Sequence, residues 1–134
     1  MSAFPLKIVT PDGLIYDGMA ESLTVRTTTG DMGVLAGHIN CVAPLGMGRA
    51  TVVIDGERRY AACIGGMLSV VGGNVTLVPT TFEWAESIDY ARAEASGQRA
   101  ESILADKSST DTDLRLAEAR LKRALIRKSV ATYK

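Results

Sequence analysis

The sequence predicts an α+β protein, with an N-terminal antiparallel β-sandwich followed by a C-terminal antiparallel two-helix hairpin. Up to Pro79, short runs rich in Val, Ile and Thr alternate with turn residues such as Gly, Pro, Asn and Asp, which is typical of many short strands. After Trp84 there is no proline and only one glycine, Gly97, and apolar residues recur at helical spacing. We therefore expect a sandwich domain over residues 1–84 and a helical hairpin over residues 85–134.

The strands follow from alternation and from turn chemistry. In SLTVRT, residues 22–27, apolar Leu23 and Val25 alternate with polar side chains, which is the two-residue period of a half-buried strand. Asp55-Gly56 lies between two further runs and predicts a hairpin, because a type I′ turn needs positive φ at both central residues. Short antiparallel strands of this kind pack as a sandwich or a barrel. The expected strands include residues 6–10, 22–27, 50–54, 59–64 and 75–78.

The helices follow from start signals and helical spacing. Ser87 is the predicted N-cap of the first helix, and a second start signal lies at Asp111 to Asp113, after the polar residues 107–110. The seam between the helices is narrow and rich in alanine, and Gly97 within the first helix costs about 1 kcal/mol relative to alanine. The hairpin is therefore either a movable element or a permanently docked appendage, and the residues alone leave both open. The helical repeat is carried by Ile88, Ala91, Ala95, Arg99 and Ile103, and then by Leu114, Ala117, Leu121, Ala124 or Leu125, and Lys128.

Composition excludes several classes of protein. With 46% hydrophobic and 22% charged residues the chain is globular, and its 15 basic and 15 acidic residues predict no general attraction to nucleic acid or anionic lipid. The first ten residues lack a secretory signal and no run approaches the ~20 apolar residues of a membrane span, so we expect a soluble, unprocessed chain without direct membrane insertion. Cys41 and Cys63 lack CxxC spacing, and we expect both to be reduced and buried in a cytosolic compartment.

The stretch GDMGVLAGHIN, residues 30–40, which we expect to form a loop, combines three glycines with the only histidine, His38. The chain has no GK[ST], GxGxxG or GxSxG motif, which argues against a phosphate-binding loop, a dinucleotide site and a hydrolase. His38 and Cys41 have HxxC spacing, but a tetrahedral metal site needs more ligands, so we predict no metal site and no catalytic residue. The glycines then shape either a docking surface or a strand crossover.

Basic residues form the second unusual pattern. On the last helix Arg120, Arg123 and Arg127 fall at i, i+3 and i+7, so one side carries a positive stripe. Arg92 and Arg99 share a face of the first helix. Such helices are usually solvated and ion-paired, whereas the functional alternative is an acidic partner or a phosphate-bearing ligand held by several guanidinium groups.

Five segments, in order along nearly the whole chain, resemble the epsilon-subunit family of bacterial F-type ATP synthases. They are LKIVTPDGLIYDG (6–18), GDMGVLAGHIN (30–40), GGMLSVVGGNVTLV (65–78), IDYARAEASGQRAESIL (88–104) and LAEARLKRALIRKSVA (116–131). The resemblance implies a non-catalytic subunit of the central rotor, with a β-sandwich that binds the gamma subunit and rests on the c-ring. It implies a peripheral location on the cytoplasmic side of the bacterial cell membrane, and coupling of ion translocation to ATP synthesis. The residues that would face the c-ring are Asp31, Met32, Gly33 and His38.

The resemblance also implies two roles for the hairpin. Extended along gamma, it would meet an acidic segment of the beta subunit, next to alpha, and inhibit ATP hydrolysis through Arg115, Arg120, Lys122, Arg123 and Arg127. Folded down, it binds ATP as a regulatory ligand in some members of the family, although no cofactor is required. By position, the ATP ligands would be Glu83, Ile88, Asp89, Arg92, Ala93, Arg99, Arg123 and Arg127.

Two other functions fit the same architecture. A free-standing ATP-binding sensor would use the hairpin without any rotor, and co-purification with gamma would separate it from a rotor subunit. An independent enzyme is disfavoured, because the chain lacks a recognisable catalytic set.

Overall fold

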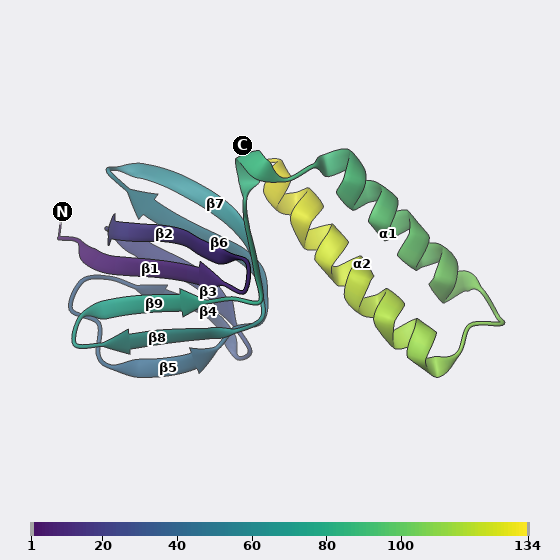
Figure 1. Ribbon diagram of the computed structural model, residues 1–134, viewed down its shortest axis with the longest axis horizontal. Coiled ribbons are helices and arrows are strands. Elements are labelled where there is room, and N and C mark those ends of the chain that lie inside the picture. The colour runs from purple at the N-terminus through teal and green to yellow at the C-terminus, as the bar shows by residue number, and fades with distance from the viewer. Residues whose placement is uncertain (1, 134) are drawn as a thin grey trace. The chain divides into compact units, whose positions relative to one another are not determined.

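The computed structural model describes residues 2–133, and the chain divides into two compact units, Met1–Trp84 and Ala85–Lys134 (Figure 1). The first unit contains the strands and the second contains the helices. The strands are β1 (Phe4–Thr10), β2 (Gly13–Ala20), β3 (Ser22–Thr27), β4 (Gly30–Val34), β5 (Cys41–Pro44), β6 (Met47–Ile54), β7 (Glu57–Ile64), β8 (Met67–Val71), β9 (Asn74–Val78) and β10 (Thr81–Trp84).

The strands form two five-stranded sheets that pack as a sandwich. The first sheet has the order β2-β1-β9-β8-β5 and the second has the order β10-β7-β6-β3-β4. All neighbours are antiparallel except β1 and β9, which run parallel with Leu6 opposite Val75. The predicted sandwich is therefore confirmed, with one parallel pair that the sequence did not predict.

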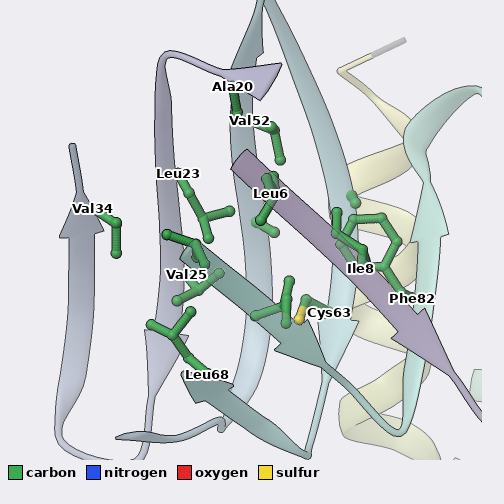
Figure 2. Close-up of a cluster of buried hydrophobic side chains, with 14 of the residues drawn as sticks. Leu6, Ile8, Ala20, Leu23, Val25, Val34, Val52, Cys63, Leu68 and Phe82 are labelled. Carbon is green, nitrogen blue, oxygen red and sulfur yellow. The ribbon is translucent and has the colours of Figure 1, made fainter. Parts of the chain in front are cut away.

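The core lies between the sheets and is built by alternation along each strand. On β1, Phe4, Leu6 and Ile8 are buried while Lys7 is exposed. Figure 2 shows Leu6 and Ile8 among side chains from the second sheet, such as Val52 and Phe82. Each fully buried side chain of this size contributes roughly 1.5–3 kcal/mol, so the sandwich is the strongly stabilised part of the chain.

Turn chemistry and alternation predicted some strands but not others. The Asp55-Gly56 hairpin is confirmed, with φ of 52° and 78°, between β6 and β7. The expectation of a loop over residues 30–40 is wrong for its first half, because β4 pairs with β3 from Gly30 to Val34. The runs singled out in the sequence do not include β2, β4, β5, β8 or β10. Glycine, proline or outward-facing apolar residues obscure the alternation in the first four of these strands, and β10 has only 4 residues.

The second unit is an antiparallel helix pair, as predicted (Figure 1). A short 3-10 turn, Ala85–Ser87, precedes α1 (Tyr90–Ala105), and α2 spans Asp111–Ala131. The predicted N-cap Ser87 is wrong, because Ser87 lies in the 3-10 turn and the Asp89 carboxylate accepts from the Arg92 amide at 3.0 Å. Helix α2 begins with a capping box, in which Thr110 and Asp113 each accept from the other's backbone amide.

Small residues line the seam between the two helices. Ala93, Gly97 and Ala100 are the buried residues of α1, so the helical repeat expected through Ala91 and Arg99 is wrong, since both are exposed. Ala117 and Ala124, which the expected repeat included, are buried along α2. Small side chains allow close approach of the helices but bury little apolar area. The seam therefore holds the helices together less strongly than the sandwich core holds its sheets.

Candidate functional site

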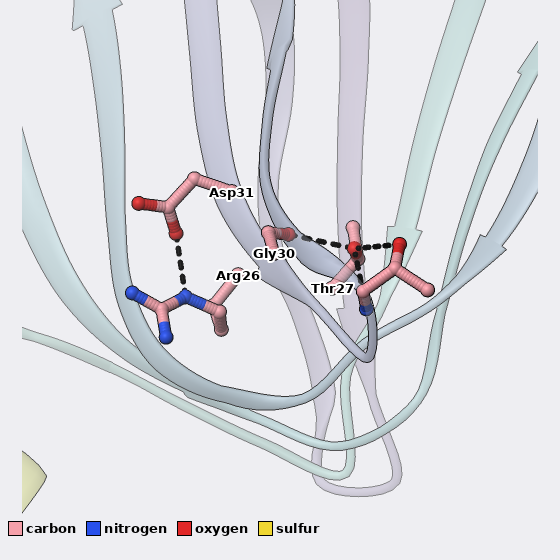
Figure 3. A network of polar contacts seen from close by, with 5 residues as sticks. Arg26, Thr27, Gly30 and Asp31 are labelled. Carbon is pink, nitrogen blue, oxygen red and sulfur yellow. Dashed lines mark hydrogen bonds and ion pairs between the residues drawn. The ribbon is translucent and has the colours of Figure 1, made fainter.

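The four predicted c-ring residues lie in two different settings. Asp31, Met32 and Gly33 belong to strand β4. His38 lies in the segment that follows β4, past the end of the strand that is farther from Asp31. Arg26 on β3 lies opposite Asp31, and its Nε donates to Asp31 Oδ1 at 2.6 Å (Figure 3). This hydrogen bond lowers the pKa of Asp31 below its ordinary value. Asp31 therefore remains ionised at neutral pH with its charge already balanced within the chain.

The segment from Leu35 to Asn40 presents apolar side chains to solvent. Leu35 and Ile39 are 64% and 78% exposed, and Gly37 between them has a φ of 82° that favours glycine. His38 Nδ1 donates to the Ile39 carbonyl at 2.8 Å, and Asn40 Oδ1 accepts from the Gly72 amide at 2.9 Å. The segment is thus fixed to the turn between β8 and β9, and its exposed apolar residues favour a docking surface over a simple crossover.

One part of the outer face of the first sheet, over β5, β8 and the end of β9, is also apolar, whereas Lys7, Asp17 and Asn74 make the part over β1 and β2 polar. Register places Pro44 of β5 beside Met67 of β8, and Met67 beside Val78 of β9. The face continues to Val42 and Val71, and the four large side chains of the set are 43–64% exposed. We define the apolar face as Val42, Pro44, Met67, Val71 and Val78. A contiguous exposed group of this kind marks a contact surface rather than scattered surface hydrophobics.

The outer face of the second sheet is polar by contrast. A shallow groove of about 150 Å³ is lined by Thr24, Arg26, Asp31, Arg49 and Thr51. The Arg49 guanidinium lies 5.4 Å from the centre of the Tyr60 ring on the same sheet. The apolar face on the first sheet therefore has the composition expected at the core of a protein interface, and the groove on the second sheet does not.

The described residues hold no metal-ligand cluster, and the two cysteines of the sandwich lie in different environments. Within residues 2–133, no group of three or more His, Cys, Asp and Glu side chains is placed to hold a metal ion, and no helix there is long and apolar enough to cross a membrane. Burial raises the pKa of the Cys63 thiol to about 12. The expectation that both cysteines are buried is wrong for Cys41, which is half-buried at the surface with its Sγ 4.0 Å from His38 Nδ1.

These environments predict different thiol reactivity. At pH 8 a thiol with a pKa of about 12 is ionised in roughly one molecule in ten thousand, so buried Cys63 should not react with Ellman's reagent in the native chain. We expect one fast thiol per chain and a second only after unfolding in guanidinium chloride. Cys41→Ser should remove the fast phase; two equally fast native thiols would contradict the assignment.

The arginines of both helices lie on one side of the hairpin. Counted at about 100° per residue from the buried seam, Arg92 and Arg99 of α1 lie on the side opposite Glu94 and Glu101. The same count on α2 places its arginine stripe on the side opposite Leu125. We define the arginine face as Arg92, Arg99, Arg120, Arg123 and Arg127.

A groove occupies the other side of the hairpin. It has a volume of about 200 Å³ and runs between α1 and α2, with Gly97 and Ala124 at the seam. Glu94, Gln98 and Glu101 of α1 and Leu121, Leu125 and Lys128 of α2 complete its lining. Because residues of both helices line this one groove, the groove sides of α1 and α2 face the same way. The arginine face is the other side of the hairpin.

The predicted ATP ligands are only partly brought together. Arg92, Arg99, Arg123 and Arg127 share the arginine face, and none of the eight predicted residues lines the groove. Glu83 belongs to β10 in the other unit, and the buried Ala93 is part of the helix seam. Asp89 is engaged as the N-cap of α1, and Ile88 is buried beside it. Arg115 and Lys122, predicted to contact the beta subunit, lie away from the arginine face by the same helical count.

Sequence reasoning missed the apolar face. Its strands carry apolar residues on both sides, as in MLSVV (67–71), and this loss of alternation was the signal that could have revealed it.

Family models match the whole described fold. A model described as the ATP synthase delta/epsilon chain beta-sandwich domain matches residues 3–85, and one described as the ATP synthase delta/epsilon chain long alpha-helix domain matches residues 86–132. The chain is 47% identical over 131 residues to the ATP synthase epsilon chain of Bacillus velezensis, with 98% of each chain covered. It is 41% identical over 136 residues to that of Ruminococcus albus, with 100% of each covered.

Two solved structures have a similar fold. A chain in the cryo-EM structure of the Euglena gracilis mitochondrial ATP synthase matches with a TM-score of 0.83 and 23% identity, covering 100% of this chain and 83% of that chain. A chain in the Tetrahymena thermophila mitochondrial ATP synthase, from the central stalk and c-ring, matches with a TM-score of 0.60 and 12% identity, with 95% of each covered. At these identities the likeness concerns the fold.

Proposed function

The chain belongs to the ATP synthase delta/epsilon family and is an epsilon-type subunit of the F-type central stalk, and we propose that it docks through its sandwich and regulates through its hairpin. In this proposal the sandwich binds the gamma subunit and rests on the c-ring, so that the subunit turns with the rotor and couples ion translocation to ATP synthesis. The subunit itself is non-catalytic and lies peripherally, on the cytoplasmic side of the cell membrane.

The observation that carries the docking half is the apolar face of the first sheet. Val42, Met67, Val71 and Val78 expose large apolar side chains side by side, whereas the outer face of the second sheet carries arginine, threonine and aspartate. Burial of such a patch against a partner yields about 25 cal/mol per Å² of apolar area. We therefore assign the gamma contact to the apolar face.

The c-ring contact is assigned to the segment around His38. Leu35 and Ile39 flank this residue and are the exposed apolar side chains of the segment. Asp31, whose carboxylate is held by Arg26, contributes to this contact through its position on β4 and not as a free charge.

The arginine face supports ATP as the regulatory ligand of the hairpin. Four of its arginines were predicted as ATP ligands, and they come from both helices. Several guanidinium groups on one face can bind a triphosphate through charge-assisted hydrogen bonds, and Mg²⁺ would balance part of the remaining charge. A ligand that bridges α1 and α2 stabilises the closed pair by mass action.

The same arrangement links ATP to inhibition of hydrolysis. Arg123 and Arg127 belong both to the proposed ATP site and to the set proposed to contact the beta subunit. A guanidinium group engaged by phosphate is not available to an acidic segment, so the two contacts exclude each other. Bound ATP therefore keeps the hairpin closed, and its loss releases α2 to restrain the catalytic head.

Isothermal titration of the chain with MgATP tests the ligand assignment. We expect binding in the micromolar to low-millimolar range, together with slower hydrogen exchange across α1 and α2. Arg92→Ala combined with Arg123→Ala should weaken binding at least tenfold, since each charge-assisted hydrogen bond contributes about 1.5–3 kcal/mol.

Arg115→Ala is the matched control for this experiment. It removes the same charge from α2 but lies off the arginine face, so binding should change less than twofold. Equal binding by the wild-type chain and the double variant would show that the arginine face is not the ATP site. An ATP-binding chain that fails to associate with gamma would instead favour a free-standing sensor.

A further inference from the structure

Gly97 lies in the middle of α1, buried in the seam against α2. An added Cβ at this position would lie 3.4 Å from the Ala124 Cβ, at the short limit of ordinary contact and without a clash, and 3.9 Å from Leu121 Cδ1. Its backbone is helical, so no left-handed conformation requires glycine there. Neither the space nor the backbone therefore explains why this residue has no side chain.

The absence of a side chain weakens the helix pair in two ways. Glycine in a helix interior disfavours the helix about fivefold relative to alanine, the factor that corresponds to ~1 kcal/mol. The missing methyl group also leaves the floor of the groove open between Leu121 and Ala124. The N-terminal ends of the helices have no matching weakness, because Asp89 caps α1 and Thr110 with Asp113 forms the capping box of α2.

We propose that Gly97 sets how readily α1 and α2 separate, and that it holds the closed pair below the stability that this seam could reach. With alanine at position 97, the new methyl group would contact Ala124 and α1 would be more stable as a helix. The new contact favours the closed pair directly, and the higher helix propensity favours it to the extent that a separated α1 loses helical structure, because isolated helices of this length are marginal in water. The use of this equilibrium in regulation rests on the proposed function, but the equilibrium itself is a property of the helix pair.

The direction of the effect on regulation follows from this equilibrium. Stabilising the closed pair lowers the population of separated helices, so fewer chains would remain for bound ATP to shift to the closed pair. A chain with Gly97→Ala should therefore restrain ATP hydrolysis less in the assembled enzyme. With glycine at this position, a ligand or a partner can shift the equilibrium between closed and separated helices.

Hydrogen exchange of the full chain without nucleotide tests the proposal. We expect amides in the middle of α1 and α2 to exchange at least fivefold more slowly in Gly97→Ala than in the wild-type chain. Slowing in both helices is required, because separation of the pair exposes both, whereas a change confined to α1 would report only on that helix. Amides of the sandwich strands provide an internal reference that should not change.

Two further variants make the result specific. Gln98→Ala changes the neighbouring exposed residue by a small amount of helix propensity, so its exchange rates should stay within about twofold. Ala100→Gly places a glycine one turn along the same seam and should accelerate exchange at least fivefold.

The proposal has clear contrary outcomes. Unchanged or faster exchange in Gly97→Ala would overturn it, because the seam would then require glycine for close packing of the helices. Slowing confined to α1 would also overturn it, since Gly97 would not control separation. Because no nucleotide is present, failure of the chain to bind ATP would leave this result unaffected, so the two proposals fail separately.

Discussion

Gly66→Ala is expected to destabilise the sandwich by about 3 kcal/mol or more. Gly66 has a φ of 93°, and an added Cβ would overlap the Val78 carbonyl oxygen and lie 2.6 Å from Pro79 Cα. Both obstacles are backbone atoms, which cannot move aside without disturbing the turn from β7 into β8. The Gly66 carbonyl also accepts from the Leu45 amide at 2.8 Å, so a shifted turn would lose this bond to the segment after β5.

Gly33→Ala is the matched control, because it adds the same methyl group to the same sandwich. Gly33 lies on β4 with no heavy atom within 4 Å of the new Cβ and without a left-handed backbone, so stability should change by less than about 1 kcal/mol. Urea unfolding followed by Trp84 fluorescence measures both variants. Trp84 reports on the sandwich because the centre of its ring lies 4.9 Å from the centre of the Phe82 ring. Equal midpoints for the two variants would contradict the steric account.

Val71→Asp is expected to weaken association with the gamma subunit at least a hundredfold. Val71 is 59% exposed in the free chain, so a carboxylate there remains hydrated and the sandwich should fold normally. Once buried against an apolar partner, the same carboxylate would lose its water without an ion-pair partner, which costs several kcal/mol. Each 1.4 kcal/mol is a factor of ten in affinity.

Thr24→Asp controls for the added charge. Thr24 lies on the outer face of the second sheet, in the polar groove beside Arg26 and Arg49, and a new carboxylate there should change affinity less than threefold. Isothermal titration of gamma with each variant gives the comparison, with thermal unfolding as the check on folding. If Thr24→Asp were the variant that lost binding, the gamma contact would lie on the second sheet.

Local signals predicted the elements whose structure depends on neighbouring residues. Asp55-Gly56 specified its turn through backbone chemistry, and the alternation in residues 22–27 specified β3 without further context. Strand β4 was missed because its strand character comes from pairing with β3, which places Asp31 opposite Arg26. Register between strands depends on the whole sheet, so neither that strand nor its ion pair could be derived locally.

The candidate surfaces show the same limit. Arginine spacing predicted a stripe on α2, but the shared face with Arg92 and Arg99 depends on how the helices pair through Gly97 and Ala124. The apolar face joins β5 to the β8–β9 hairpin, which lies much further along the chain. Such surfaces exist only after the topology is known, and their composition alone resembles that of a buried core.

ATP hydrolysis by F1 depleted of this chain, measured before and after the chain is added back, tests the proposed role most directly. The wild-type chain should bind and lower the rate at low MgATP, with restraint relieved as MgATP rises, while Val71→Asp should fail to bind or inhibit. The same assay should show weaker restraint by Gly97→Ala. An unchanged rate with the wild-type chain bound would contradict regulation by the hairpin, and absence of binding would contradict the rotor role itself.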